Sequence, residues 1–310
     1  MRAFVNWGMA RILSTSICYF LPNWRYASIA SGLALIPLLL ILIFVVPESP
    51  AWLYSKQKFE EMKISQTRIS KISHGPIPEV HKDPTEKKTS YLDLWKDPKA
   101  RVLVGILCLM WFTASVTSYT NDLNSTALSG DFFINQILFG VFIFASKIIL
   151  GLTDKFYPQF NRRHLHQWNQ LLVIIGFLGV AILFCFDYKG WMQLALNLLG
   201  SVCTEYTWDA CYLCAIESVP SEVRTSALGT FSLVARIGAL LAPVLGFLSS
   251  KWSPAAYLII SGLGMLNLAM SCIYLPETKG KDLFHVKPKL HHFEEDEQNG
   301  YDMEILNSKS

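Results

Sequence analysis

Charged side chains inside apolar segments are the feature of this sequence that is most able to do chemistry. Lys147 lies in the middle of a long apolar run, and Arg11 and Arg236 lie in two others. Glu205 and Asp209 are four residues apart in a further apolar segment, which is about one helical turn. Ionised side chains are costly inside a bilayer, so they face a cavity or pair with one another. The pattern therefore predicts a polar cavity between helices.

Small and aromatic residues accompany these charges at helical spacing. The small residues are Gly140 and Gly151 around Lys147, and Gly229, Ser232 and Ala239 around Arg236. Trp208 and Tyr212 flank Asp209, and Tyr119 lies in another apolar segment. Small side chains leave room beside a long cation, and aromatic rings offer a surface on which an aromatic solute can stack.

Two interpretations of the charges remain open from the residues alone. If all five line one cavity, three cations face two acids, and the unmatched positive charge would bind a negatively charged solute. In the alternative, Lys147 and Arg236 simply neutralise Glu205 and Asp209 as buried pairs.

The elements that must position these residues are apolar segments of membrane-spanning length. A helix needs about 20 residues to cross roughly 30 Å of hydrocarbon. Eight segments meet this description: 3–21, 27–46, 102–121, 132–152, 168–186, 191–215, 226–248 and 254–275. The sequence thus predicts an all-α, multi-pass membrane protein, because lipid requires every backbone polar group to be satisfied within the helix.

The polar segments divide these spans into groups. We expect a helix pair in residues 1–46, a cytoplasmic loop in 47–101, a six-helix bundle in 102–275 and a disordered tail in 276–310. Apolar residues at helical spacing predict short surface helices within 55–74, and prolines predict an irregular linker over 75–89. Lys and Arg concentrate in 47–101 and in the loop 154–167, which places both termini in the cytoplasm.

Several ordered motifs resemble one known family. They are Pro47-Glu48-Ser49-Pro50-Ala51-Trp52-Leu53 after a span, Asp154-Lys155-Phe156 with Asn161-Arg162-Arg163, Glu217 through Arg224, Ala235-Arg236-Ile237-Gly238 followed by Ala242-Pro243, and Pro276-Glu277-Thr278-Lys279-Gly280. In this order and spacing they resemble the organic cation, anion and carnitine transporters of the major facilitator superfamily. That family has twelve spans, so the resemblance implies a partial fold: the last two helices of the first bundle and the complete second bundle.

The resemblance also implies roles for individual residues. Phe144-Ala145-Ser146-Lys147 and the Arg236 motif are most similar to organic anion transporters, which implies that both cations bind a carboxylate, Arg bidentately and Lys as a point charge. Trp111, Phe112 and Tyr119 resemble the segment that gives those transporters an aromatic contact. A cytoplasmic charge cluster that stabilises one gate state would comprise Glu48, Asp154, Arg162, Arg163, Glu217 and Arg224.

Departures from the family pattern qualify this interpretation. Ala51 replaces an arginine, four residues (157–160) interrupt the 154–163 loop, and Ser201 stands where anion transporters have a lysine. Glu205 and Asp209 are additional acids, which keeps zwitterions and cations open as substrates. A sugar porter shares some motifs, but its Gln-Gln-x-x-Gly run is replaced here by WFTASVTSY within 102–121.

The expected function is alternating-access transport of small organic anions across the plasma membrane. The alternative class is a truncated chain that does not transport and acts by binding partner chains that supply the missing helices. The expected partners are thus a small organic anion and the lipid bilayer, with another transporter chain in the alternative class, and no nucleic acid. No phosphate-binding loop, no nucleophile with a base and no metal-ligand spacing is found, so we expect neither an enzyme nor a cofactor or metal.

Overall fold

The computed structural model describes residues 7–73, 75, 98–128, 130–156, 161–188, 190–219 and 223–277. Within these ranges every regular element is a helix. The predicted linker beyond residue 75 and the predicted tail beyond residue 277 lie outside the described residues.

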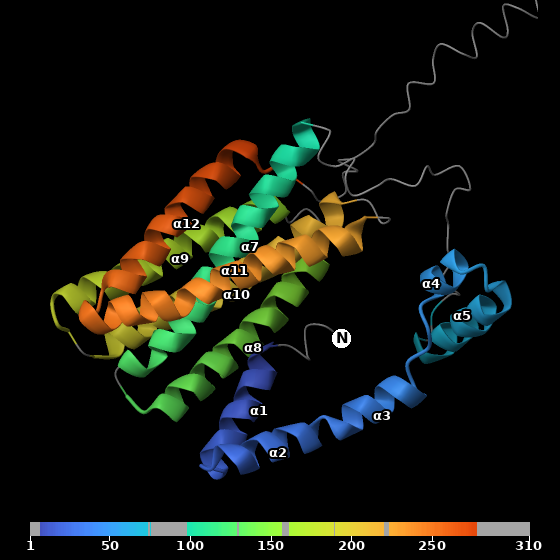
Figure 1. The fold of residues 1–310 in the computed structure, drawn as a ribbon, viewed down its shortest axis with the longest axis horizontal. Helices are drawn as coiled ribbons and strands as arrows, with labels where there is room; N and C mark the ends of the chain where they lie inside the picture. Colours follow the sequence, from blue (N-terminus) through green and yellow to red (C-terminus); the bar gives the residue numbers. More distant parts are fainter. Residues whose placement is uncertain are drawn as a thin grey trace, which may run out of the picture.

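Six long helices form the larger unit of the molecule (Figure 1). They are α7 (Pro98–Asn124), α8 (Phe132–Phe156), α9 (Arg162–Cys185), α10 (Trp191–Ser218), α11 (Arg224–Lys251) and α12 (Ala255–Tyr274). The main pairings are α7 with α11, and α9 with both α10 and α12. Each of the six predicted spans from residue 102 onward therefore corresponds to one helix.

Two buried clusters hold the six helices together. Trp111 of α7 packs with Cys211 of α10 and Phe231 of α11, while Phe177 of α9 packs with Tyr257 of α12. Close helix contact also depends on glycine: a Cβ at Gly176 would lie 3.0 Å from the backbone of α10. Small residues allow such approach where lipid gives apolar surfaces no reason to associate.

The amino-terminal helices are arranged differently. They are α1 (Trp7–Phe20), α2 (Trp24–Ala34), α3 (Ile36–Phe44), α4 (Pro50–Ser55) and α5 (Phe59–Ser73). Among the described amino-terminal helices, α1 packs against the six-helix unit, mainly along α8. A Cβ at Gly8 would overlap the backbone of Phe144 and lie 2.6 Å from the carbonyl oxygen of Gly140. The space beside Gly140, which the sequence suggested was left for Lys147, is thus filled by α1.

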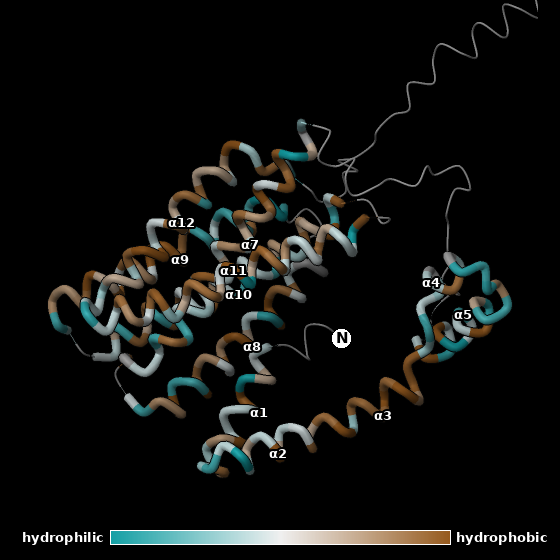
Figure 2. The backbone as a smooth tube through the Cα atoms, in the orientation of Figure 1, coloured by the Kyte–Doolittle hydropathy of each residue, from teal (hydrophilic) through white to brown (hydrophobic). Residues whose placement is uncertain are grey.

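Helices α2 and α3 extend away from the six-helix unit toward α4 and α5 (Figure 1), and α3 is apolar along its whole length (Figure 2). The single span predicted over 27–46 is divided at Leu35, because Pro37 has no N–H with which to continue the helical ladder. The prediction of surface helix within 55–74 is confirmed by α5, and α4 lies just before that range. Arg68 of α5 donates to the carbonyl oxygen of Phe44, which joins α5 to the end of α3.

Six segments of the described chain are long and apolar enough to cross a membrane: the combined α2–α3 segment, α7, α8, α9, α11 and α12. Helix α1 has only 14 described residues, and α10 carries Glu205 and Asp209 among several other polar side chains. With 28 residues, however, α10 extends over about 42 Å and contacts four other helices, so its polar side chains have protein around them.

Candidate functional site

Lys147 of α8 meets both acids of α10. Its ammonium nitrogen lies 2.6 Å from a carboxylate oxygen of Asp209 and 3.6 Å from one of Glu205, and it donates to the Glu205 backbone carbonyl at 3.0 Å. One turn of helix separates the two acids, so both reach the same neighbouring helix. The Tyr206 hydroxyl donates to the carbonyl oxygen of Ser146 at 2.7 Å and fixes α10 against α8. The structure therefore shows Lys147 as a partner of both acids.

Arg11 brings a second cation from α1 into the same region. Its guanidinium lies 2.7 Å from a carboxylate oxygen of Asp122 and donates to the side-chain oxygen of Gln136 at 2.6 and 2.9 Å. The ring of Phe139 lies beneath it, 5.5 Å from centroid to guanidinium carbon. Sequence reasoning did not select Asp122 or Gln136; the available signal was a polar side chain at the end of an apolar run.

A small cavity lies between the Arg11 and Lys147 clusters. Its walls include Arg11, Asp122, Asn121, Ser201 and Glu205. The cavity volume is about 10 Å³, which accommodates roughly one water molecule and not an organic solute. Ser201, at the position where the family resemblance would place a lysine, accepts a hydrogen bond from Asn121 at 2.9 Å.

Arg236 of α11 has different surroundings. Its side chain is exposed, and its guanidinium donates to the hydroxyl of Tyr119 at 3.0 Å. Among the residues that the structure describes, no carboxylate pairs with it. The Ser115 hydroxyl, which donates to the carbonyl of Ala235, fixes α11 beside α7, so that Arg236 and Tyr119 are neighbours. The alternative in which Arg236 neutralises an acid of α10 is therefore not what the structure shows.

Of the predicted aromatic residues, Trp208 and Tyr212 gather around Trp111. The centroid of its ring lies 5.6 Å from that of Trp208, 4.4 Å from Tyr212 and 5.9 Å from Phe231. Trp111 itself is buried, whereas Tyr212 is exposed. Within the described chain, the indole N–H of Trp111 has no hydrogen-bond partner. This cluster joins α7, α10 and α11 next to Asp209, with one ring open to the outside.

A second charge cluster lies at the end of the bundle where α9 begins. Arg162 Nε is 3.2 Å from a carboxylate oxygen of Glu217, and both residues belong to the predicted gating set. Glu277 accepts from the backbone N–H of Arg162 at 2.9 Å and of Arg163 at 3.3 Å, so its carboxylate caps the first turn of α9. Glu277 was not among the predicted gating residues, although the motif 276–280 contains it.

The other predicted gating residues contribute to this cluster unequally. The Arg163 guanidinium donates to the carbonyl oxygen of Cys272 at 2.6 Å, and that of Arg224 donates to the carbonyl of Val219 at 3.2 Å. Glu48 is exposed beside α4, where its backbone carbonyl accepts from Ser65. The side chain of Asp154 lies outside the described part of the structure. The structure thus brings together only part of the predicted set.

The arrangement of these helices is that of part of a major facilitator fold. The solved structures agree: the proton:xylose symporter XylE bound to 6-bromo-6-deoxy-D-glucose is similar with a TM-score of 0.65 and 20% identity, over 89% of this chain and 63% of that one. The inward-open xylose transporter XylE from E. coli is similar with a TM-score of 0.59, over 89% and 61% of the two chains.

The chain belongs to the Sugar (and other) transporter family, whose model matches residues 3–290. It is 39% identical to the uncharacterized protein F23F12.3 of Caenorhabditis elegans, over 91% of this chain and 59% of that protein. It is 29% identical to solute carrier family 22 member 7 of Mus musculus, over 89% and 52%. An organic cation transporter protein of Drosophila melanogaster is 26% identical over 91% and 53%. The chain thus spans about half the length of these relatives, and it is a multi-pass membrane protein.

Proposed function

We propose that this chain supplies the substrate-binding half of a transporter for small organic anions, with Arg236 as the group that binds the carboxylate. The observation that carries the proposal is the contrast among the three intramembrane cations. Arg11 and Lys147 each contact a carboxylate, whereas Arg236 is exposed and, among the described residues, bonded only to the neutral hydroxyl of Tyr119. An unmatched guanidinium binds a carboxylate bidentately at low geometric cost.

The surroundings of Arg236 support an organic ligand. Tyr119 fixes its orientation, and the exposed ring of Tyr212 belongs to the aromatic cluster around Trp111 on the neighbouring helices. A Cβ at Gly229, two turns before Arg236, would have no neighbour within 4 Å. A ligand whose carboxylate binds Arg236 would thus have open space and aromatic surface on adjacent helices for its organic body.

Uptake of labelled aromatic carboxylates tests this proposal. The wild-type sequence and its variants are measured after grafting onto an intact amino-terminal half of a relative. Arg236→Ala is expected to lower uptake at least about ten-fold, since one charge-assisted contact is worth about 1.5–3 kcal/mol. Arg236→Lys should keep part of the affinity, and Arg25→Ala, which changes an exposed arginine in the first turn of α2, should keep all of it. Unchanged affinity in Arg236→Ala would refute the assignment.

A zwitterionic solute is a second candidate, favoured by one observation. Lys147 faces two acids rather than one, so its cluster carries an excess negative charge when both are ionised. A molecule with an ammonium group and a carboxylate would match this excess and Arg236 together. Competition of the labelled anion by a betaine, compared with the same acid lacking its ammonium group, distinguishes the two substrate classes.

A binding role without transport is the candidate from a different class. Helices α2 and α3 are almost wholly exposed, and the chain spans about half of its relatives. A partner chain that contributes further helices would cover this surface. Cells that make only this chain are the test: uptake above background supports autonomous transport, and background uptake at normal surface abundance supports the partner model.

A further inference from the structure

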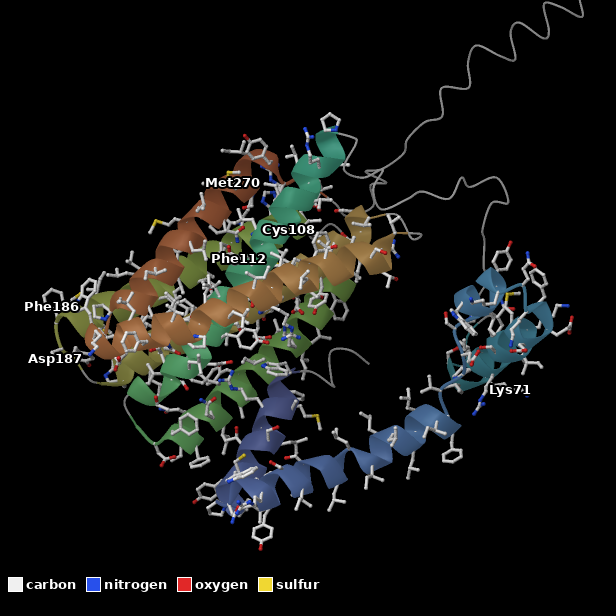
Figure 3. All side chains as sticks on the ribbon, viewed as in Figure 1. Lys71, Cys108, Phe112, Phe186, Asp187 and Met270 are labelled. Carbon is white, nitrogen blue, oxygen red and sulfur yellow. The ribbon has the colours of Figure 1, made fainter. Side chains whose placement is uncertain are left out.

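A second and larger cavity lies away from the charged site, at the opposite end of the bundle from Arg162 and Glu217. Its volume is about 450 Å³, and it is formed where α7, α9 and α11 end and α12 begins. Phe186 and Asp187, labelled in Figure 3, mark the end of α9 at this side of the molecule. The volume falls within the range of about 300–1,000 Å³ that is typical of small-molecule sites.

One wall of this cavity is aromatic and apolar. Phe184 and Tyr257 are stacked, with ring centroids 5.7 Å apart and planes at 21°, and both line the cavity. Pro243 and Gly246 of α11 form part of the lining. A Cβ at Gly246 would have no atom within 4 Å, so the helix leaves open space at this point. Such a wall suits the flat body of a ring system.

The remaining wall is polar but uncharged. Hydroxyl groups come from Thr126, Ser249, Ser250 and Ser253, and an amide comes from Asn124. The Asn124 amide nitrogen donates to the carbonyl of Thr120, while its side-chain oxygen and the Thr126 hydroxyl have no partner within the described ranges. Among the described residues that line it, none is a Lys, Arg, Asp or Glu, so they offer neutral donors and acceptors and no counter-ion for a charged ligand.

The two cavities are separated by buried hydrogen bonds. Asn197 donates to Asn121 at 2.6 Å and to the Tyr257 hydroxyl at 3.3 Å. All three side chains are buried, with Asn121 facing the small charged cavity and Tyr257 the larger neutral one. The larger cavity is therefore a different site from the one that holds Arg11 and Glu205.

We propose that this cavity, lined by Phe184, Gly246 and Thr126 at the end of the bundle, is a second binding site for an uncharged ligand with a flat ring body and a hydroxyl or ether oxygen. The ring body lies against Phe184 and Tyr257, and its oxygen meets Thr126 and Asn124. Two sources share this chemistry: a sterol of the bilayer, or a neutral solute from the aqueous side. The proposal stands independently of transport and of Arg236.

Photolabelling of the full chain in lipid nanodiscs tests the proposal. One probe is a photoreactive sterol that keeps its hydroxyl group, and the other is a photoreactive neutral aryl glycoside. Gly246→Phe places a phenyl ring in the open space and is expected to lower labelling of cavity residues at least about ten-fold. Gly262→Phe is the matched control, because Gly262 also has no atom within 4 Å of a Cβ and lies outside the cavity.

The outcomes distinguish the two ligand sources, and some of them would contradict the proposal. Cavity labelling by the sterol, competed by unlabelled sterol, assigns the site to a bilayer lipid; labelling by the glycoside assigns it to a solute. Equal losses of labelling in Gly246→Phe and Gly262→Phe would overturn the site, provided that thermal unfolding curves show both variants to be folded. So would labels scattered evenly over the outward faces of the helices. Competition by an aromatic carboxylate as strong as by the neutral compound would overturn the uncharged class.

Discussion

The intramembrane cations lie in two contrasting regions. In the first, Arg11 and Lys147 are largely buried, and each touches a carboxylate of another helix at 2.7 Å or less. In the second, Arg236 is exposed and touches a phenol. A buried pair holds helices together at the expense of desolvation, whereas an open cation keeps its capacity for a ligand. The difference separates residues that keep the bundle assembled from the residue proposed to bind the solute.

The largest effect that this comparison predicts is on Lys147. Lys147→Met leaves Glu205 and Asp209 without their cation, and breaking a buried pair costs about 3 kcal/mol or more of unfolding free energy. The measurement is unfolding of the chain in mixed micelles with increasing SDS. Adding Asp209→Leu to Lys147→Met should recover much of the loss. A single variant as stable as wild type would remove the distinction between the regions.

The next effect concerns the close contact of α1 with α8, which places Arg11 beside Asp122. Gly8→Val forces side-chain atoms into the backbone of α8, and overpacking of this kind costs about 2 kcal/mol. The separation of α1 from α8 should also remove the bond between Arg11 and Asp122. The same SDS titration measures the change. Gly32→Val is the control, because no atom lies within 4 Å of a Cβ there, and a loss of equal size in both variants would contradict the role of close packing.

A smaller effect is expected at the end cluster, where the carboxylate of Glu277 caps the first turn of α9. Glu277→Ala removes the acceptor of two backbone N–H groups in the first turn of α9 and should lower the unfolding free energy by about 1 kcal/mol. Hydrogen exchange of the amides of Arg162 and Arg163 should accelerate. Unaltered exchange would show that the cap does not protect this turn.

The smallest effect on stability is expected in the open region. Arg236→Met removes one hydrogen bond on an exposed side chain and should change the unfolding free energy by less than about 0.5 kcal/mol. The same variant should lose carboxylate binding in the grafted protein. Stability loss comparable to that of Lys147→Met would place Arg236 with the structural cations and would weaken the proposed function.

Much of the fold is readable from the sequence. Blocks of about 20 apolar residues fix the positions of the helices, because lipid leaves the backbone no alternative to the helical ladder. Each of the helices α7 to α12 begins and ends within a few residues of its predicted span, apart from extra polar turns such as Pro98–Arg101. The break at Leu35 has a signal in the sequence, which is Pro37 two residues later. The pairing of α1 with α8 could not be predicted, because nothing in the sequence indicates that Gly8 contacts Gly140, which is 132 positions away.

The sequence by itself determined that positive and negative groups would lie inside the bundle, because these residues are part of the apolar segments that form its helices. It could not say which cation meets which acid. That choice was made by tertiary structure: Ser115 and Gly238 fix α11 against α7, so Arg236 reaches Tyr119, while α10 turns both of its acids toward α8 and Lys147. Pairing depends on the rotation and approach of whole helices, which are set by packing across the bundle and not by spacing along the chain.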